Sequence, residues 1–464
     1  MGDSQGSGRV QTGSDRFGGV QIGSDRFRRV LTVVLVVAAA VGLLAQQRAS
    51  DPLQPAAERY AKLVLALGQL DADYVDAFYG PPEWRKEAES QKLSLASIEE
   101  QAAAVAGEVD GRPVFRLAGM SRLEAELWML RWRYLSRQLS ALRTRVAMLQ
   151  GKRLTFDEES LALYDAEAPT HTEADFAATI SELDARLPGT GTLVERYDRF
   201  KQAFVIPPAR VDRVFQEAIR ACRERTLQHV ALPADERFTV EYVTGKTWSG
   251  YNWYQGGYRS LIQVNTDLPI YIDRAVDLAC HEGYPGHHVY NVLLEQHLVR
   301  DRGWREFSVY PLFSPQSLIA EGTANYGIEV AFSQSDRAAY ERDVLFPLAG
   351  LEPARAAGYY DVMALVDRLS YAGNEAARRY LNGTIDRDAA AAWLERYAMY
   401  ARPRAEQRVR FIDQYRSYVI NYNLGKDLVR AFVEKKAGKH ASSAARWREF
   451  AALLSSPRLP SGLK

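Results

Sequence analysis

The sequence predicts a mainly helical fold with one small antiparallel β-sheet embedded in it. Most of the chain after residue 52 carries apolar residues at helical spacing, and the longest such stretch, Arg122–Leu149, contains neither proline nor glycine. Strand-like sequence is confined to residues 238–264. No linker-like stretch interrupts residues 52–464, so we expect one large multi-helix unit that includes the sheet.

The N-terminal 45 residues differ in composition from the rest. Residues 1–29 are rich in Gly, Ser and Arg and contain one segment twice, at 10–17 and 20–27, so we expect a disordered tail. Residues 30–45 form an apolar run after two arginines, which is typical of a signal-peptide core or a transmembrane anchor. The rest of the chain is therefore expected outside the cytoplasm, either released to the periplasm or medium, or anchored to the inner membrane.

The predicted helices begin near Pro52, where a leucine-rich apolar face continues through aromatic residues to Gly80-Pro81-Pro82. Further helices are predicted at residues 122–149, 173–186, 191–204 and 208–230. Three strands follow: residues 238–243 alternate in polarity, and residues 248–254 and 258–264 flank Gly256-Gly257. Beyond them the chain is helical again, with breaks at Pro311, Pro315, Gly350, Gly383 and Pro403.

Charge and cysteine content exclude two classes of protein. The formal net charge is +1 at pH 7, which gives no electrostatic basis for binding nucleic acid. The two cysteines, Cys222 and Cys280, are too few for a disulfide framework. Cys280 directly precedes His281, but neighbouring residues on a helix point about 100° apart. We therefore expect a buried free thiol rather than a metal ligand.

A histidine cluster is the strongest functional signal. The segment HEGYPGHH at residues 281–288 holds three of the chain's seven histidines, and metal binding is the commonest reason to gather imidazoles. A helical zinc-hydrolase motif, HExxH, places two imidazoles at i and i+4 on one face, with the glutamate as general base. Here Pro285 stands at i+4, so the strict motif fails and a later histidine must serve.

Two histidines compete for this second position. On an uninterrupted helix His288 would lie about 20° from His281, and His287 about 120° away. Pro285, however, clashes with the carbonyl of residue 281, and the adjacent glycines loosen the turn, which predicts a bulged or broken helix. If two residues loop out, His287 becomes the i+4 partner. The sequence favours His287 and leaves His288 as the alternative metal ligand, with the other histidine supporting the site or facing the substrate.

A second helix is predicted to complete the metal site. The segment AEGTANYGIE at residues 320–329 carries two carboxylates on roughly similar faces. Glu321 is the candidate third ligand, which leaves one position open for water. Glu329 or Asn325 is expected to hold an imidazole N–H beside the metal.

Together, HEGYPGHHVY and EGTANYGIE resemble the bacterial family catalogued as domain of unknown function 885, whose pattern is HEGxPGHH followed by an EGWAxY-type helix. That family resembles the helical gluzincin peptidases, such as thimet oligopeptidase, carboxypeptidase Taq and angiotensin-converting enzyme. The resemblance covers about residues 55–450 and implies a gluzincin-like catalytic unit. It implies Zn²⁺ held by His281, His287 and Glu321, with Glu282 as general base. The chain departs from the pattern at residues 323–325, which lack the family's tryptophan, and this bears on the shape of the substrate pocket.

The predicted function is zinc-dependent hydrolysis of peptide bonds in short peptides. Glu282 would take a proton from zinc-activated water and pass it to the leaving amine. A phenol from the C-terminal helices, Tyr422 or Tyr418, would hold the oxyanion. The strand at 258–264 would either pair with an extended peptide through main-chain hydrogen bonds or only cover the active-site helix.

Two other functions use the same residues. One is a zinc hydrolase of non-peptide amides, and the other is a non-catalytic protein with a structural metal site. Glu282 argues against the second function, because a structural site has no use for a general base.

Overall fold

Capping residues define the start of α5 (Arg122–Leu149). The computed structural model describes residues 51–111 and 120–464. The Ser121 side chain accepts a hydrogen bond from the backbone N–H of Glu124, whose carboxylate accepts one from the backbone N–H of Ser121. The predicted bounds of this helix are confirmed, and its buried face packs on α4.

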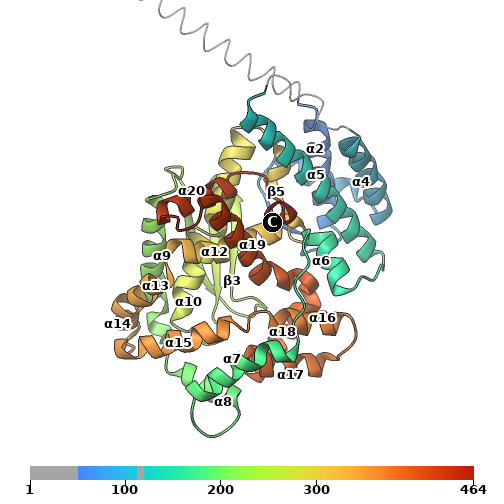
Figure 1. Cartoon of the computed structure of the whole chain (residues 1–464). Helices are drawn as coiled ribbons and strands as arrows, with labels where there is room; N and C mark the ends of the chain where they lie inside the picture. Colours follow the sequence, from blue (N-terminus) through green and yellow to red (C-terminus); the bar gives the residue numbers. More distant parts are fainter. Residues whose placement is uncertain (1–50, 112–119) are drawn as a thin grey trace, which may run out of the picture. The chain divides into compact units, whose positions relative to one another are not determined.

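The described chain is mainly helical, which confirms the predicted fold class (Figure 1). Before the sheet lie α2 (Gln54–Gly68), α3 (Pro82–Gln91), α4 (Leu95–Asp110), α5, α6 (Phe156–Tyr164), α7 (Glu173–Arg186), α8 (Leu193–Gln202) and α9 (Val211–Leu227). After it come α10 (Asp273–Leu278), the π-helical η2 (Ala279–Gly283), α11 (His287–Leu294), α12 (Pro315–Ala331), α13 (Gln334–Tyr340), α14 (Phe346–Ala349) and α15 (Ala356–Asp367). The C-terminal part contains α16 (Ala372–Leu381), α17 (Arg387–Ala398), α18 (Arg402–Tyr415), the 3₁₀ turn η7 (Arg416–Val419), α19 (Ile420–Ala437) and α20 (Ser443–Leu454).

The embedded sheet has the strand order β2-β4-β3, with β2 (Arg237–Val243), β4 (Arg259–Asn265) and β3 (Gly250–Gly256). The three strands lie where the sequence predicts them. The pair β3–β4 is antiparallel, as expected for a hairpin around Gly256-Gly257, whereas β2 runs parallel to β4. The sheet is therefore mixed, and β4 is its central strand.

The apolar segment that precedes Gly80 is divided between a helix and a strand. The sequence predicts one continuous apolar face, but α2 ends at Gly68 and β1 (Val75–Phe78) follows. β1 pairs antiparallel with β5 (Val309–Pro311), which lies more than two hundred residues further along the chain. Because the partner strand is so distant in sequence, local periodicity could not indicate this pairing.

The helices α12 and α19 cross at the centre of the unit, where their backbones touch (Figure 1). A Cβ atom on Gly322 of α12 would lie 2.5 Å from the carbonyl carbon and oxygen of Gly425 of α19, so both positions require glycine. This close crossing brings η7 and the first turn of α19 next to Glu321. α12 is buried along most of its length, with Leu318 in one hydrophobic cluster and Ile319 in another.

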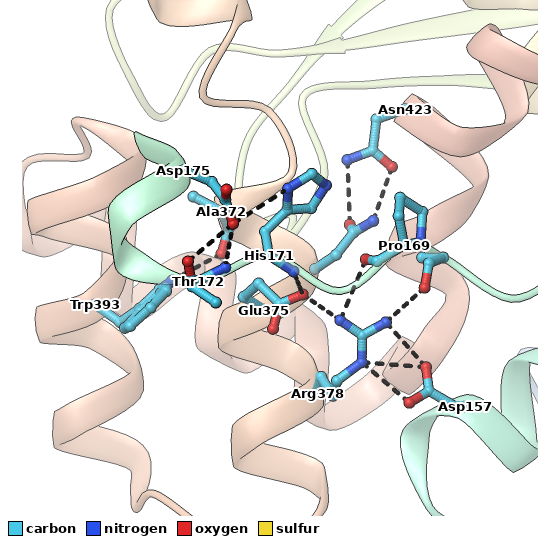
Figure 2. A network of polar contacts seen from close by, with 12 residues as sticks. Asp157, Pro169, His171, Thr172, Asp175, Ala372, Glu375, Arg378, Trp393 and Asn423 are labelled. Carbon is cyan, nitrogen blue, oxygen red and sulfur yellow. Dashed lines mark hydrogen bonds and ion pairs between the residues drawn. The ribbon is translucent and has the colours of Figure 1, made fainter. Parts of the chain in front are cut away.

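A buried polar network fixes α16 against α6 and α19 (Figure 2). Arg378 forms ion pairs with Asp157 of α6 and with Glu375, and it donates to a backbone carbonyl in the segment after α6. Asn374 and Asn423 exchange side-chain hydrogen bonds of 3.0 and 3.2 Å. Two carboxylates compensate the charge of Arg378 between α16 and α6, and the neutral asparagine pair links α16 to α19.

The described part of the chain falls almost entirely within one unit, Leu53–Lys464. The predicted disordered tail at 1–29 and the predicted anchor or signal segment at 30–45 lie outside the described residues. Among the helices of residues 51–111 and 120–464, none has the length and apolar character required to cross a membrane.

Candidate metal centre

The helix that carries the histidine cluster is broken between its first and second histidines, as the sequence predicts. His281 lies in η2, Tyr284 is extended, the Tyr284–Pro285 peptide bond is cis, and α11 begins at His287. A Cβ atom on Gly286 would lie 1.8 Å from the carbonyl oxygen of His281, so only glycine fits at this turn. The break turns the two imidazoles toward each other, with 3.2 Å between their Nε2 atoms.

Glu321 completes a group of three, here called the metal cluster: His281, His287 and Glu321. Its Oε2 atom lies 3.2 Å from Nε2 of His281 and 3.7 Å from Nε2 of His287. Burial opposes ionisation of Glu321, but the two adjacent imidazoles hold its pKa well below the ordinary value. The cluster therefore presents a carboxylate and two imidazole nitrogens to a single point.

The spacing of these atoms fits a zinc ion. Zinc bonds of about 2.0–2.1 Å in a tetrahedron place the ligand atoms about 3.3 Å apart, close to the observed 3.2, 3.2 and 3.7 Å. Oε2 of Glu321 is buried and accepts no well-formed hydrogen bond from the described residues. An unsatisfied buried carboxylate oxygen at the centre of the cluster is what a metal-binding site requires before the ion is bound.

His288 does not belong to the metal cluster, so the alternative assignment of this residue as a ligand is corrected. It is fully buried, and both ring nitrogens already have partners: Nδ1 lies 2.9 Å from Oγ of Ser260, and Nε2 lies 2.9 Å from Oε2 of Glu236. These three residues, Glu236, Ser260 and His288, are here called the core cluster. The break at Gly286 starts α11 one residue before His288, which directs His288 into the core.

Glu282 lies beside the metal cluster, with its side chain against the first residue of β3. A Cβ atom on Gly250 would lie 2.9 Å from Oε1 of Glu282, so the glycine leaves room for the carboxylate. Asn252 donates a 2.7 Å hydrogen bond to the backbone carbonyl of Glu282 and fixes η2 to the strand. Burial raises the pKa of Glu282, although the two neighbouring imidazoles oppose this rise.

The two candidate tyrosines have different positions. The phenol of Tyr418 donates a 2.8 Å hydrogen bond to Oε1 of Glu321, so this tyrosine orients a candidate ligand. Tyr422 lines the cavity, and its ring centroid lies 5.8 Å from that of Tyr418. Burial, followed by the charge of Glu321, raises the pKa of Tyr422 well above its ordinary value, so the phenol keeps its proton.

The metal cluster opens onto a cavity of about 1010 Å³, which is large enough for a short peptide. Residues 247–252, which include the start of β3, form part of its wall. The prediction that the strand at 258–264 offers a substrate-pairing edge is wrong, because β4 is paired on both sides. In the described sheet the edge strand next to the cavity is β3. Strand order depends on pairing between distant segments, which the local pattern does not give.

Two predicted supporting contacts are also absent from the described residues. Glu329 forms ion pairs with Arg430 and Lys426 instead of meeting an imidazole. The side-chain amide of Asn325 donates 2.9 Å to the backbone carbonyl of Glu321, one helical turn earlier. Both residues line the cavity, but neither contacts a histidine of the metal cluster.

Asp76 of β1 is a cavity residue that the sequence did not single out. It accepts a hydrogen bond from the phenol of Tyr251, and burial raises its pKa to about 6. The hydrogen bond from Tyr251 partly offsets this rise in pKa. Asp76 lines the same cavity as the three residues of the metal cluster. The sequence pattern misses Asp76 because it assigns the segment before Gly80 to an apolar helix face instead of a strand.

Cys222 and Cys280 form a disulfide, which corrects the prediction of a buried free thiol. Their Cα atoms are 5.7 Å apart, within the range for such bonds. The bond links α9 to η2 at the residue directly before His281. Two cysteines 58 residues apart carry no local signal of pairing, so only the fold reveals it.

No protein-family model and no curated protein matches the sequence. The structure is similar to that of a protein described as a candidate lipoprotein from Colwellia psychrerythraea, with 13% identity, a TM-score of 0.49, and coverage of 82% of this chain and 70% of the other. It is also similar to a candidate lipoprotein of unknown function from Shewanella oneidensis, with 15% identity, a TM-score of 0.39 and coverage of 81% and 79%. A protein designated BsuCP matches with 9% identity, a TM-score of 0.44 and coverage of 87% and 88%.

Proposed function

We propose that the protein is a zinc-dependent metallopeptidase that hydrolyses short peptides. The observation that carries this proposal is the buried carboxylate of Glu282 beside three ligand atoms that lie within 4.8 Å of one another. His281, His287 and Glu321 are the proposed metal ligands. A purely structural metal site needs no general base, whereas hydrolysis needs one at this position.

Zinc in the metal cluster would supply a Lewis acid for the scissile carbonyl and would lower the pKa of a coordinated water. Glu282 accepts the proton of the attacking water and returns it to the leaving amine, and its raised pKa suits this exchange. The protonated phenol of Tyr422 donates a hydrogen bond to the oxyanion as it forms. Tyr418 keeps the carboxylate of Glu321 oriented throughout.

A peptide is favoured over a non-peptide amide because β3 offers an unpaired main-chain edge within the described sheet. An extended peptide can add to such an edge through backbone hydrogen bonds, which a compact amide cannot do. Gly250 lies on this edge against Glu282, so a peptide paired there passes close to the general base.

We also propose that the protein works outside the cytoplasm. The apolar run at 30–45 after two arginines supports export, and the Cys222–Cys280 disulfide fits an oxidising compartment. Fractionation of cells that express the full chain, followed by mass spectrometry of the unreduced protein, tests both points. A reduced protein in the cytoplasmic fraction would contradict the assignment.

The decisive experiment replaces the general base and leaves the proposed ligands intact. Glu282→Gln is expected to retain one zinc per chain and to lower peptide hydrolysis by roughly 10²–10⁴-fold. Metal content is measured by elemental mass spectrometry, and hydrolysis by mass spectrometry of a peptide library. Glu329→Gln is the matched control, since Glu329 is paired with Arg430 instead of facing the metal cluster. A parent protein without zinc at neutral pH, or an unchanged rate in Glu282→Gln, would refute the proposal.

A further inference from the structure

One wall of the cavity carries a pair of adjacent arginines that no carboxylate neutralises within the described chain. Arg404 and Arg408 lie one turn apart on α18, and both line the cavity wall. Neither guanidinium forms an ion pair with a carboxylate among residues 51–111 and 120–464, and Arg404 donates a hydrogen bond to the side-chain amide oxygen of Gln407. Burial, followed by the positive charges of Arg408 and Arg274, lowers the pKa of Arg404.

Four other cations that line the cavity are paired with carboxylates: Arg274, Arg337, Lys426 and Arg430. Arg274 meets Asp277 at 3.0 Å, and Arg430 meets Glu329. Arg404 and Arg408 differ from these cations in lying one turn apart without a carboxylate partner in the described chain, and two like charges in a partly buried position are unfavourable without an anion. Each guanidinium offers five N–H donors in a planar fork, which matches the two oxygens of a carboxylate.

The arginine pair is connected to the metal cluster through two aromatic rings. The guanidinium of Arg408 lies 5.6 Å from the ring centroid of Tyr422, which in turn packs on Tyr418, the residue bonded to Glu321. Tyr422, Arg408 and Glu282 all line the same cavity. The three contacts of this path measure 2.8, 5.8 and 5.6 Å, so a few extended peptide residues, at about 3.4 Å each, can follow it.

We propose that Arg404 and Arg408 bind the C-terminal carboxylate of the substrate, so that the enzyme is an exopeptidase that cleaves near the C-terminus of short peptides. The inference rests on the proposed peptidase function and adds to it the substrate end that is recognised. We choose the terminal carboxylate over an acidic side chain because every linear peptide has a C-terminal carboxylate, whereas only some peptides contain aspartate or glutamate.

Binding is measured first, in the zinc-loaded Glu282→Gln protein, so that no hydrolysis intervenes. The probes are an N-acetylated pentaalanine with a free C-terminus, the same peptide as its amide, and an amide whose last residue is glutamate. Calorimetry is expected to give a dissociation constant about ten- to a hundredfold lower for the free acid than for the plain amide. Adding Arg404→Gln and Arg408→Gln together should bring this ratio close to one.

Two comparisons exclude a merely structural effect. Arg410→Gln, on the exposed face of the same helix, should leave the ratio unchanged. Arg404→Lys with Arg408→Lys keeps the charge but loses the planar fork, so it should restore only part of the preference. The double glutamine variant should bind the plain amide as the parent does and should lose only the preference for the free acid. This result would establish that Arg404 and Arg408 bind the terminal carboxylate.

The assignment is overturned if free acid and amide bind equally to the parent, or if the preference survives in the double glutamine variant. It is also overturned if only the glutamate amide binds tightly, since the recognised group is then a side chain. Failure of the peptidase proposal is separate from these outcomes. An unmutated enzyme that cleaves no peptide, while Glu282→Gln still prefers the free acid, refutes the hydrolysis and leaves the carboxylate site in place.

Discussion

Two His–Glu clusters take their histidines from the same short segment, residues 281–288, and they differ in how their polar atoms are satisfied. In the core cluster, Glu236 accepts hydrogen bonds from His288 and Tyr284 and pairs with Arg223, and Ser260 takes the remaining ring nitrogen. In the metal cluster, two Nε2 atoms and a carboxylate oxygen converge, and that oxygen has no well-formed hydrogen bond within the described chain. The residue types are alike, but the polar atoms of the first arrangement are satisfied, whereas the second leaves a carboxylate oxygen without a partner.

The difference shows how two adjacent histidines take different roles: His287 lines the cavity, and His288 forms buried hydrogen bonds in the core. His287 and His288 are neighbours on α11, yet they point about 100° apart. One therefore faces the cavity and the other the core. Satisfying every polar atom of the core cluster keeps η2 and α11 rigid, while the incomplete metal cluster stays available for a ligand.

The largest expected effect separates the two histidines by metal content. His287→Gln is expected to abolish stoichiometric zinc binding, because it removes one of three convergent ligands. The matched variant His288→Gln should retain one zinc per chain and lose about 1–3 kcal/mol of stability, because buried hydrogen bonds are broken. Elemental analysis and urea unfolding measure the two quantities. Zinc loss in His288→Gln, with retention in His287→Gln, would reverse the assignment.

How much of the site is predictable from the sequence depends on the range of the interactions. Local spacing and residue chemistry are enough to predict three features. These are the position of Glu282 directly after His281, the break of the helix at Pro285, and Glu321 as a candidate ligand. The choice between His287 and His288 could not be settled in this way, because it depends on the backbone at Gly286, which touches the carbonyl of residue 281.

Long-range features were missed for the same physical reason. Glu236, which completes the core cluster, lies in a turn 52 residues before His288 and has no local pattern that indicates a buried role. The paired edges of β4, the disulfide and the strand β1 likewise depend on partners far along the chain. The helices were predicted more successfully, since spacing and capping within each segment determine most of their bounds.

The disulfide tests whether the two clusters are independent. It ties α9 to η2, the segment that carries His281 of the metal cluster, and it closes a loop of 58 residues. Cys222→Ala with Cys280→Ala is expected to lower the free energy of unfolding by about 4 kcal/mol through the greater entropy of the unfolded chain. Zinc stoichiometry should be unchanged, because neither sulfur belongs to the metal cluster. A fall in zinc content that parallels the loss of stability would show that the bond sets the geometry of the ligands.

Lowering the pH should reduce the stability of the folded protein through protonation of Glu236 in the core cluster. Burial disfavours its ionised form, but hydrogen bonds from His288, Tyr284 and Arg223 lower its pKa from 4.5 to about 2. A lowered pKa in the folded state contributes stability above pH 4.5, and this contribution, roughly 3 kcal/mol, is lost as the pH falls from 4.5 toward 2.

Glu236→Gln removes this titrating group and isolates its contribution. The difference in unfolding free energy between the parent and the variant should be largest above pH 5 and should shrink toward pH 2. Both proteins are compared in the metal-free state, so that protonation of Glu321 affects them equally. A difference that stays constant between pH 6 and pH 2 would show that Glu236 is not ionised through these contacts.

The smallest effect concerns the tautomer of His288. Burial lowers the pKa of His288, so the ring is neutral at pH 7 and carries one proton. Since the carboxylate of Glu236 can only accept, that proton lies on Nε2, and Nδ1 accepts from the hydroxyl of Ser260. Ser260→Ala should cost about 1 kcal/mol by leaving Nδ1 without a donor, and Ser260→Thr should restore the bond. Nitrogen NMR of labelled histidine should report Nε2–H in the parent, and an Nδ1–H signal would contradict this arrangement of the core cluster.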